Sequence, residues 1–534
     1  MVKKTNILII MADQLAANAL SMYGNRVCKT PNLDKLASDG TIFENAYSNN
    51  PVCVPSRASM LSGHLTPEIA VYDNANELAS SMPTMAHYMR SLGYETFLSG
   101  KMHFIGPDQL HGFNERLTTD VYPANFDWIG NWSAGASYVP SGTALNGVVE
   151  AGPCIRTMQE DYDDEVEYQS LKKIYDLARN INQNPFFGIV SFTSPHTPFN
   201  VSQKYWDLYE NKNILLPEVG PIPFDELDYF SKSLFFAHGR HRHTITDEHI
   251  LNTRRAYYGM ISYIDEKIGR IVQLLEDTNQ KDNTAIFFVS DHGEMLGERG
   301  MWFKQCFWEW SAHVPMIASI PGFLQGNKSQ VITSLVDLLP TIIDIGNTDR
   351  VPVEVENLAG KSLIPFFSDA GHSLDSFAIS DYYHIGPCVP TRMVRKNNLK
   401  LIYTHGHPHL LFDLKNDPNE LKNISIDKKY ELELKDLLQI CMQNWDPDQL
   451  TLDIVKSQKR RLLMKNLPGD PPEWDFIAQM GDDKRYVRRG GVDATKSKLR
   501  IPPVKTIPPD LPPLDKNTIE QILAGKLKHN FRVE

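Results

Sequence analysis

Four continuous runs of apolar residues stand out along the chain, and polar residues follow each of them. The runs read NILIIMA at 6–12, YETFLS at 94–99, FFGIVSFT at 186–193 and TAIFFVS at 284–290. A run that is largely apolar, without strict alternation, predicts a strand covered on both faces of its sheet. The polar residues after the runs are Asp13, then Lys101 and His103, then His196, and finally Asp291 and His292.

Segments with helical periodicity lie between these runs, at 84–92, 163–181 and 253–278. In the last of them, apolar residues recur at intervals of three and four, as on one face of a helix. Strands that alternate with helices predict an α/β fold with a large, mainly parallel sheet sandwiched by helices. Binding sites in such sheets gather beyond the carboxyl ends of the strands, so we expect the polar residues after the four runs to meet there.

The pattern changes after about residue 375. Residues 393–403 and 410–414 predict short strands, 415–418 a turn and 429–444 a helix. We therefore expect a catalytic domain over residues 1–375 and a smaller α+β subdomain over 376–457.

Residues 458–534 predict an extended tail. They begin near the basic residues Lys459, Arg460 and Arg461 and hold six prolines in the segment IPPVKTIPPDLPPLD. Such a segment favours polyproline-like chain. We expect it to lie along the body or along a neighbouring subunit of a homo-oligomer, with a disordered tail as the alternative.

Composition narrows the possible partners. The chain has 54 Lys and Arg against 65 Asp and Glu, a formal net charge of −11, which disfavours nucleic acid as a partner. An anionic ligand must then be attracted by local positive charge. Six cysteines form no CxxC pair, which argues against a zinc site of the common spacing and against a dense disulfide framework.

The first residues predict a buried strand rather than a secretory signal. The apolar run after Lys3 and Lys4 is short and ends at Asp13 and Gln14. The chain has no stretch of 18 apolar residues, so no membrane span is expected. We expect a cytoplasmic protein without a membrane partner.

Residues 53–57 read Cys-Val-Pro-Ser-Arg, a segment typical of enzymes that hydrolyse sulfate esters, and the polar residues after the strands could supply the other parts that this reaction needs. Besides the nucleophile, these parts are a divalent cation, positive charge around the sulfonate oxygens, and an acid for the departing alkoxide. Oxygen-rich ligation favours Ca²⁺ or Mg²⁺ over zinc. The candidates are Asp13, Asp291 and His292 for the cation; Arg57, Lys101 and Lys304 for the sulfonate; and His103 and His196 for proton transfer.

Residues 53–57 match the C-x-P-S-R core of the type I sulfatases. The segments TPNLDKLASDGTIFENAYS, SGKMHFIG, SPHTPF, SDHGEMLGERGMWFK and LFDLKNDPNEL follow the family's order. Over roughly residues 5–425 the chain resembles the formylglycine-dependent sulfatases of the alkaline phosphatase superfamily.

This resemblance implies a role for each candidate. A maturation enzyme would oxidise Cys53 to formylglycine, whose hydrate is the nucleophile, with Pro55 and Arg57 in the core that the enzyme recognises. The resemblance also implies that the cation is bound by Asp13, Gln14, Asp291 and His292. Arg57, Lys101 and His103 would contact the hydrate. His196 and Lys304 would contact the sulfate and the leaving oxygen.

Residues 71–128 resemble the choline sulfatases in particular, and the Asp-Gln and Asp-His pairs at 13–14 and 291–292 resemble both the choline sulfatases and the phosphonate monoester hydrolases. A quaternary ammonium needs aromatic faces and anionic partners. The candidates for it are Trp128, Asn146, Asp381 and, from the tail of a neighbouring subunit, Asp493. Choline sulfate is thus the leading substrate. The alternatives are a carbohydrate or other small sulfate ester, and a phosphonate monoester or phosphodiester hydrolysed by the same aldehyde.

Non-catalytic interpretations stay open at this point. Cys53 could be a small buried side chain, Asp13 a helix cap and Trp128 a core residue. A cation-binding pseudoenzyme with an unconverted cysteine is the corresponding functional alternative. The histidine groups at 238–243 and 405–409 could bind zinc, although loosely packed histidines are the preferred interpretation.

Overall fold

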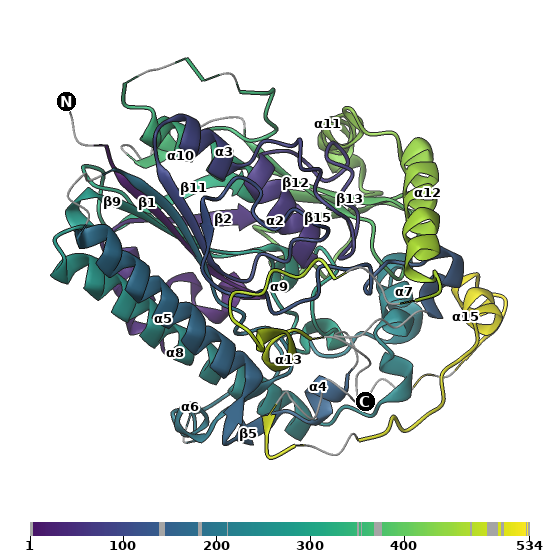
Figure 1. Cartoon of the computed structure of the whole chain (residues 1–534). Coiled ribbons are helices and arrows are strands. Elements are labelled where there is room, and N and C mark those ends of the chain that lie inside the picture. Colours follow the sequence, from purple (N-terminus) through teal and green to yellow (C-terminus); the bar gives the residue numbers. More distant parts are fainter. Residues whose placement is uncertain are drawn as a thin grey trace.

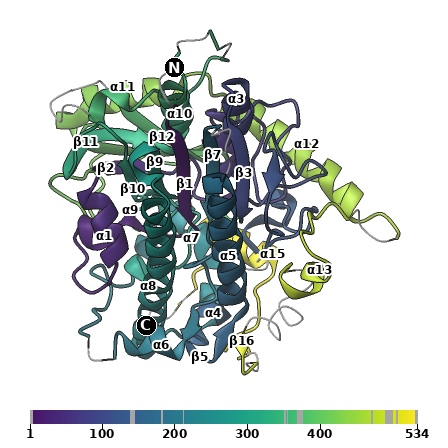
Figure 2. The ribbon, with the colours of Figure 1, turned by 60° about the vertical axis from the view of Figure 1, so that its left-hand side comes forward.

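The computed structural model describes most of the chain in three layers. A central sheet separates two groups of helices, and a smaller sheet with two long helices lies at one side (Figures 1 and 2). The described residues are 4–137, 145–179, 184–210, 212–349, 352–353, 355–367, 376–469, 473–488, 500–503, 507–529 and 531.

The central sheet has eight strands in the order β11-β2-β10-β9-β1-β7-β3-β4. Only β10 runs antiparallel to its neighbours within this sheet, so the predicted mainly parallel sheet is confirmed. The strands are β1 (Asn6–Ala12), β2 (Thr41–Tyr47), β3 (Glu95–Gly100), β4 (Glu115–Arg116), β7 (Phe186–Ser191), β9 (Thr284–Ser290), β10 (Met316–Ser319) and β11 (Asn327–Ser334).

Both faces of the sheet are covered by helices. In β1, Leu8 and Ile10 pack toward one layer, whereas Ile7 and Ile9 pack toward the other. This double burial explains why the strand is apolar at nearly every position. The first layer holds α1 (Pro31–Ser38), α5 (Met158–Arg179) and α8 (Asp247–Asp277), and the second holds α2 (Cys53–Ser62), α3 (Met85–Ser91) and α10 (Leu338–Gly346).

The four predicted strands and three predicted helices are present. Two strands, β1 and β9, have the predicted bounds. The largest shift is in α8, which begins at Asp247 rather than near 253. The side chain of Thr246 accepts a hydrogen bond from the His249 N–H and caps the helix there.

The strand register brings the polar residues to one edge of the sheet. Ala12 pairs with Ser290, while Met11 pairs with Ser191, which in turn pairs with Gly100. Because these strands are parallel, the residues directly after them leave the sheet side by side.

The C-terminal subdomain is an antiparallel sheet of β12 (Phe377–Tyr382), β13 (Thr391–Lys396), β14 (Leu399–Thr404) and β15 (Leu410–Asp413), against which α11 (Glu431–Met442) packs. The predicted α+β character is confirmed. A further helix, α12 (Pro447–Lys465), continues through residue 457, so the boundary predicted there falls inside a helix. Asp446 caps α12 and Pro447 occupies its first turn, two start signals present in the sequence.

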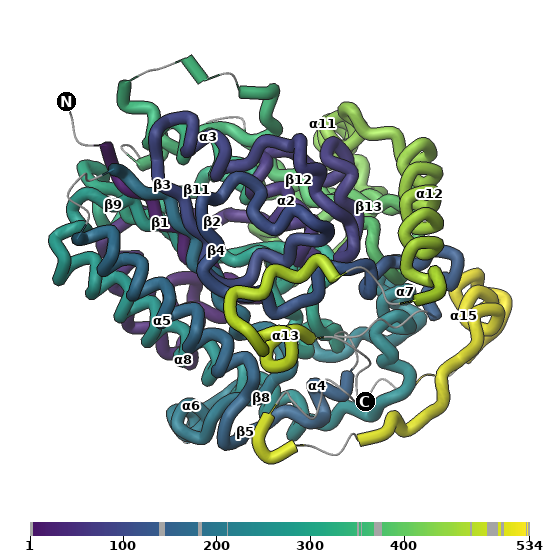
Figure 3. Tube along the Cα trace, viewed as in Figure 1, coloured from purple at the N-terminus to yellow at the C-terminus, as the bar shows by residue number. Residues whose placement is uncertain are grey.

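The described tail segments lie on the body of the same chain (Figure 3). Residues 500–501 form β16 and pair with β6 (Arg156–Thr157), and α15 (Lys516–Leu523) packs its Ile519 and Ile522 against the Phe236 side chain of α7 (Tyr229–Ala237). Contact with a neighbouring subunit, and with it the homo-oligomer, stays a prediction.

The remaining described elements are short. They are α4 (Asn146–Val149), β5 (Gly152–Cys154), β8 (Asn200–Ser202), α6 (Gln203–Asp207), α9 (Glu309–Ala312) and α13 (Asp482–Arg485). In the part of the chain that the structure describes, every helix is too short or too polar to traverse a bilayer.

Helix α12 is attached to the catalytic domain by a buried ion pair. Both terminal nitrogens of Arg461 contact Asp73, at 2.5 and 2.9 Å, and Asp73 is fully buried. Its neighbour Arg460 is exposed. The basic group at 459–461 therefore contains one structural arginine.

Replacing Arg461 with alanine should destabilise the protein, because it leaves the Asp73 carboxylate buried without its partner. We expect a loss of about 3–5 kcal/mol in the free energy of unfolding, measured by urea denaturation. The matched variant Arg460→Ala should stay close to wild type, and equal losses for both would contradict this role of the ion pair.

Candidate active site

The C-x-P-S-R segment forms the first turns of α2, and its spacing places three side chains on one helix face. Cys53 begins the helix, and Ser56 and Arg57 come three and four residues later. Pro55 is tolerated because the first helical turn needs no backbone N–H donor. The Ser56 hydroxyl donates to the Asp291 carbonyl at 2.6 Å, and Arg57 Nε donates to the Asp291 carboxylate at 2.8 Å.

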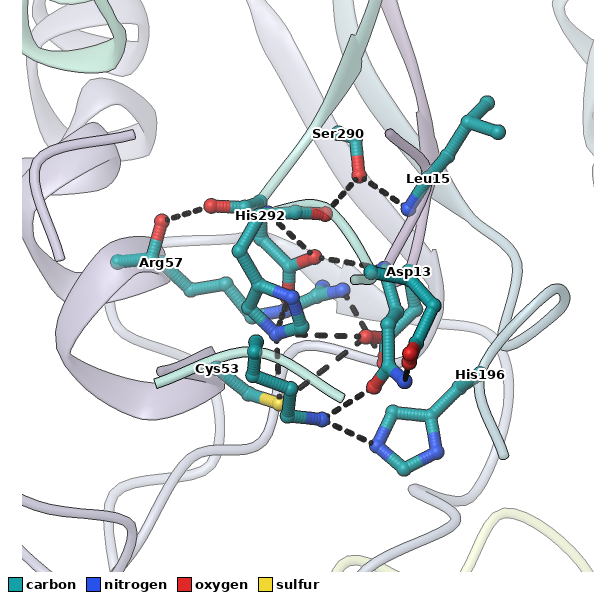
Figure 4. A network of polar contacts seen from close by, with 12 residues as sticks. Asp13, Leu15, Cys53, Arg57, His196, Ser290 and His292 are labelled. Atoms are coloured by element: carbon teal, nitrogen blue, oxygen red, sulfur yellow. Dashed lines mark hydrogen bonds and ion pairs between the residues drawn. The ribbon is translucent and has the colours of Figure 1, made fainter. Parts of the chain in front are cut away.

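Four side chains converge at the edge of the sheet, where α2 begins (Figure 4). Ligand atoms of Asp13, Cys53, Asp291 and His292 all lie within 4.8 Å of one another, and all four residues are buried. The second carboxylate oxygen of Asp291 accepts the backbone N–H groups of Gln14 at 3.1 Å and His292 at 3.0 Å. Every oxygen of this carboxylate is thus oriented by the chain itself.

The cluster has the donor set of a divalent cation site. His292 Nδ1 lies 3.2 Å from the Gly293 carbonyl, which turns the Nε2 atom toward Asp13 and Asp291, at 3.8 and 3.7 Å. Burial lowers the pKa of His292 to about 3, with Lys304 adding to the effect and Asp291 opposing it. A neutral imidazole and two carboxylates, with the Gln14 amide beside them, fit a cation bound mainly by oxygen.

Two cations balance the buried carboxylates. Arg57 donates to the Lys101 carbonyl at 2.7 Å and to Ser191 Oγ at 2.9 Å, and its remaining nitrogen lies 3.6 Å from Asp13. The Lys101 ammonium contacts Asp13 directly. Burial by itself would raise the pKa of Asp291, but the neighbouring positive charges, Arg57 foremost, and the Gln14 N–H together hold the pKa below its usual range.

Two glycines allow the backbone next to Lys101 and next to His292 to approach neighbouring backbone closely. Gly100, just before Lys101, has φ +98°, and a Cβ there would lie 2.0 Å from the Ser191 carbonyl oxygen. A Cβ on Gly293 would lie 2.1 Å from the Trp310 carbonyl oxygen. A side chain at either position would displace the residues that carry the site.

Gln14 joins the cluster through an unusual backbone conformation. Its φ is +67°, and its carbonyl accepts the Tyr257 hydroxyl at 2.6 Å. The side-chain amide lies between Glu294 and Lys304. Lys304 Nζ in turn lies 2.8 Å from His196 Nε2.

The two candidate proton carriers lie on either side of Tyr122. Its ring centroid is 4.6 Å from that of His103 and 5.8 Å from that of His196. Burial lowers the pKa of both histidines well below 6.5, with Lys101 adding to the effect at His103 and Lys304 at His196. Both ring nitrogens of His103 are buried and have no hydrogen-bond partner among the described residues, which leaves them available to a ligand.

Trp128 extends this group of rings toward solvent. It is half-buried and packs edge-to-face against Tyr122 and His103, with centroids 4.6 and 5.3 Å apart. Arg488 of the tail donates to the Tyr122 hydroxyl at 3.1 Å and lies over its ring. We call Tyr122, Trp128 and His103 the aromatic cluster.

The two other predicted headgroup residues that the structure describes, Asp381 and Asn146, have hydrogen-bond partners outside the aromatic cluster. Both oxygens of Asp381 are bound by Arg392, at 2.7 and 3.1 Å, and the carboxylate is fully buried. Its charge is neutralised within the subdomain, which corrects the expectation of a free anionic partner. Asn146 donates to the Ile507 carbonyl of the tail, and Asp493 lies outside the described residues.

Neither histidine group forms a metal site in the described part of the chain. His238 contacts Gln305, and His407 stacks on Tyr229 with centroids 3.5 Å apart. Among the described residues, the group of Asp13, Cys53, Asp291 and His292 is the only gathering of three or more ligand-type side chains. His238 is buried and packs on Phe303, so it does not belong to the solvated or loosely packed face that the sequence suggested.

Sequence reasoning did not single out several residues of the site: Ser56, Tyr122, Glu294 and Arg488. Ser56 and Glu294 stand inside the segments CVPSR and SDHGE, so their position in these segments was an available signal. Tyr122 and Arg488 come together from positions 366 residues apart, and only the fold reveals that contact.

Known proteins resemble this chain over most of its length. Residues 5–348 match the family described as Sulfatase, and residues 297–445 match the family described as N-sulphoglucosamine sulphohydrolase, C-terminal. A choline-sulfatase of Rhizobium meliloti (strain 1021) is 38% identical over 509 residues, covering 93% of this chain and 99% of the relative. An arylsulfatase of Clostridium perfringens (strain 13 / Type A) is 29% identical, covering 82% and 94%. A solved phosphonate monoester hydrolase from Silicibacter pomeroyi superposes with a TM-score of 0.65 at 25% identity, covering 87% and 96%.

Binding of a divalent cation should stabilise the folded state. At 100 times its dissociation constant, Ca²⁺ should add about 2.7 kcal/mol to the free energy of unfolding, visible as a rise in Tm that a chelator reverses. Asp291→Asn should abolish the rise.

The matched control is Asp381→Asn, which breaks a buried ion pair outside the cluster. This variant should lower Tm but keep the full Ca²⁺-dependent rise. A rise that survives Asp291→Asn, or disappears in Asp381→Asn, would count against a cation site at the cluster.

Proposed function

The chain belongs to the sulfatase family and is a sulfuric ester hydrolase, and we propose that formylglycine made from Cys53 is its nucleophile and choline sulfate its substrate. The position of Cys53 is the observation that supports formylglycine as the nucleophile. Cys53 begins α2 with its Sγ 3.2 Å from His292 Nε2 and 4.0 Å from Asp13 Oδ1, inside the candidate cation site.

The unmodified thiol is poorly suited to the reaction. Burial raises the pKa of Cys53, whereas a reactive cysteine needs a lowered pKa. A thiol that attacked sulfur would also remain as a stable thiosulfate-type adduct. An aldehyde hydrate has two hydroxyl groups, so the second can expel the sulfate by collapse to C=O.

In the proposed cycle, the oxygen of one hydrate hydroxyl attacks sulfur and the S–O bond to the alcohol breaks, and the proton that this hydroxyl loses replaces the one given to the leaving oxygen. The Lys304–His196 pair delivers a proton to the leaving oxygen, since Nζ and Nε2 are 2.8 Å apart and share one hydrogen bond. His103 then accepts the proton of the second hydroxyl, and the C–O bond to sulfate breaks as the aldehyde re-forms. Arg57 and Lys101 hold the nucleophile in place.

Asp13, Gln14, Asp291 and His292 would hold the cation, and Ca²⁺ is our first choice, with Mg²⁺ as the alternative. When bound, the ion supplies a positive field for the nucleophile and the sulfonate oxygens. The ligands' own contacts support this role, because Asp13 and Asp291 are buried and held by Arg57.

Conversion of Cys53 requires a formylglycine-generating maturation enzyme. Cys53 is only 1% exposed in the folded chain. A second protein cannot reach such a side chain without unfolding α2, so we propose that conversion precedes folding.

The aromatic cluster supports choline sulfate as the substrate. Trp128 offers an aromatic face beside Tyr122, whose own ring already contacts Lys101 and Arg488, and a quaternary ammonium binds an aromatic face through cation–π interaction. The 38% identity to a choline-sulfatase over 93% of this chain points the same way.

One observation favours a different ester. Arg488 places a positive charge beside the cluster, and its Nε and Nη2 atoms are buried without a partner among the described residues. Substrate oxygens would satisfy these donors, as in a carbohydrate sulfate. The solved phosphonate monoester hydrolase at 25% identity likewise keeps a phosphonate monoester or phosphodiester substrate as an alternative.

Mass spectrometry of the peptide that carries Cys53 tests the nucleophile. In protein produced with a formylglycine-generating enzyme, we expect the aldehyde, and sulfatase activity should rise in proportion to the converted fraction. Full activity from protein that contains only the intact thiol would remove the proposed mechanism.

Substrate choice is tested with Trp128→Ala. We expect the loss of an aromatic face to reduce kcat/KM for choline sulfate by roughly 10-fold or more, equivalent to the upper range of a cation–π contact, with a much smaller loss for an aryl sulfate. The matched control is Trp474→Ala, a half-buried tryptophan that packs on Phe126.

The control should leave the ratio of the two kcat/KM values unchanged. Equal losses on both esters after Trp128→Ala would argue against choline. A wild-type enzyme that cleaves a phosphodiester far faster than any sulfate ester would favour the phosphonate-type alternative.

A further inference from the structure

Glu294 is a buried carboxylate beside the site to which no catalytic role has been given so far. We propose that Glu294 is a positioning residue, which fixes the orientation of the Gln14 side-chain amide in a buried hydrogen-bond chain that continues through Lys304 to His196. The inference deepens the proposed function and rests on it only for the effect on turnover.

The contacts of Glu294 tie three parts of the chain together. One carboxylate oxygen accepts the backbone N–H groups of Leu296, at 3.1 Å, and Phe303, at 2.6 Å. The other oxygen contacts the Gln14 amide nitrogen, and the side chain is fully buried. The same carboxylate therefore closes the loop 294–303 that leads to Lys304 and holds the side chain of Gln14.

The chemistry of Lys304 sets the direction of the hydrogen-bond chain. An ammonium group has donors and no acceptor. The Gln14 atom that faces Lys304 must therefore be the carbonyl oxygen, and the atom that faces Glu294 must be the amide nitrogen. The chemistry of the two partners alone fixes this assignment, without any need to distinguish nitrogen from oxygen.

The hydrogen bond between Lys304 and His196 has a fixed donor as well. Because Lys304 donates, His196 Nε2 must accept, so the neutral ring carries its proton on Nδ1. That proton points to the Thr197 carbonyl at 2.7 Å. Lys304 thus determines which tautomer His196 adopts, and Glu294 supports this arrangement by holding Gln14 and the loop that leads to Lys304.

The orientation of the Gln14 amide also determines which of its atoms can face a cation. With its nitrogen bound to Glu294, Gln14 can present only its oxygen to the cluster, and a carbonyl oxygen has a second lone pair beyond the one that Lys304 uses. An amide turned the other way would offer N–H donors, which repel both a cation and Lys304.

The test exchanges the amide and the carboxylate. In Glu294→Gln, the new amide nitrogen would face the Gln14 nitrogen, and a flipped Gln14 would point its nitrogen at Lys304. In Gln14→Glu, two carboxylates would face each other. The double variant Gln14→Glu with Glu294→Gln restores every donor–acceptor pair, because the new amide donates to residue 14 and its oxygen still accepts from Leu296 and Phe303.

Two readouts are measured for each variant. The first is Ca²⁺ affinity by isothermal titration calorimetry on protein with the unconverted thiol, where no turnover occurs. We expect each single variant to lose about 10–100-fold and the double variant to regain most of this loss. The second is kcat and KM on the converted enzyme, with the larger effect in kcat and the same pattern of rescue.

Glu298→Gln is the matched control, since Glu298 is a buried carboxylate of the same loop that pairs with Arg254 at 2.7 Å. It should lower Tm while keeping Ca²⁺ affinity and kcat. Wild-type Ca²⁺ affinity in Glu294→Gln, or a double variant no better than the worse single one, would overturn the proposal. Rescue of Ca²⁺ affinity in a protein that hydrolyses no sulfate ester would uphold it and refute the proposed function instead.

Discussion

The site depends on the neutralisation of two carboxylates that have no access to water. Asp13 and Asp291 are fully buried at the ends of adjacent parallel strands, so each would be strongly destabilised as an isolated charge. Arg57 contacts both of them, and Lys101 contacts Asp13. The helix that presents Cys53 is therefore attached to the sheet by the same charges that form the candidate cation site.

This charge balance governs the neighbouring groups. Burial, with neighbouring cations adding to it, lowers the pKa values of His103, His196 and His292 and keeps these rings neutral. Neutral imidazoles can accept protons or offer lone pairs, whereas imidazolium ions would add to the repulsion among Arg57, Lys101 and Lys304. The arrangement suits an anionic ligand, which supplies the missing negative charge.

The C-terminal parts of the chain support the site from outside the central sheet. Arg461 of α12 holds Asp73, and Arg488 holds Tyr122 through its hydroxyl. Thr119, in the segment leading to Tyr122, also contacts the tail, at Asp482. The tail thus contributes to the order of the aromatic cluster as well as covering the body.

Continuous apolar runs, helical periodicity and the C-x-P-S-R spacing are local properties, so the sequence by itself predicted the α/β class, the bounds of β1 and β9, and the convergence of Asp13, Asp291 and His292. Parallel strands bring the residues beyond their carboxyl ends to one edge of the sheet, which made the meeting of Asp13 and Asp291 predictable.

Other features depend on which partner occupies a position distant in sequence. Asp381 is neutralised by Arg392, Arg461 is a buried ion-pair partner rather than part of a surface patch, and Glu294 contacts Gln14 across 280 residues. Because the state of a buried charge or amide is set by the atoms that surround it, only the tertiary structure could decide these roles.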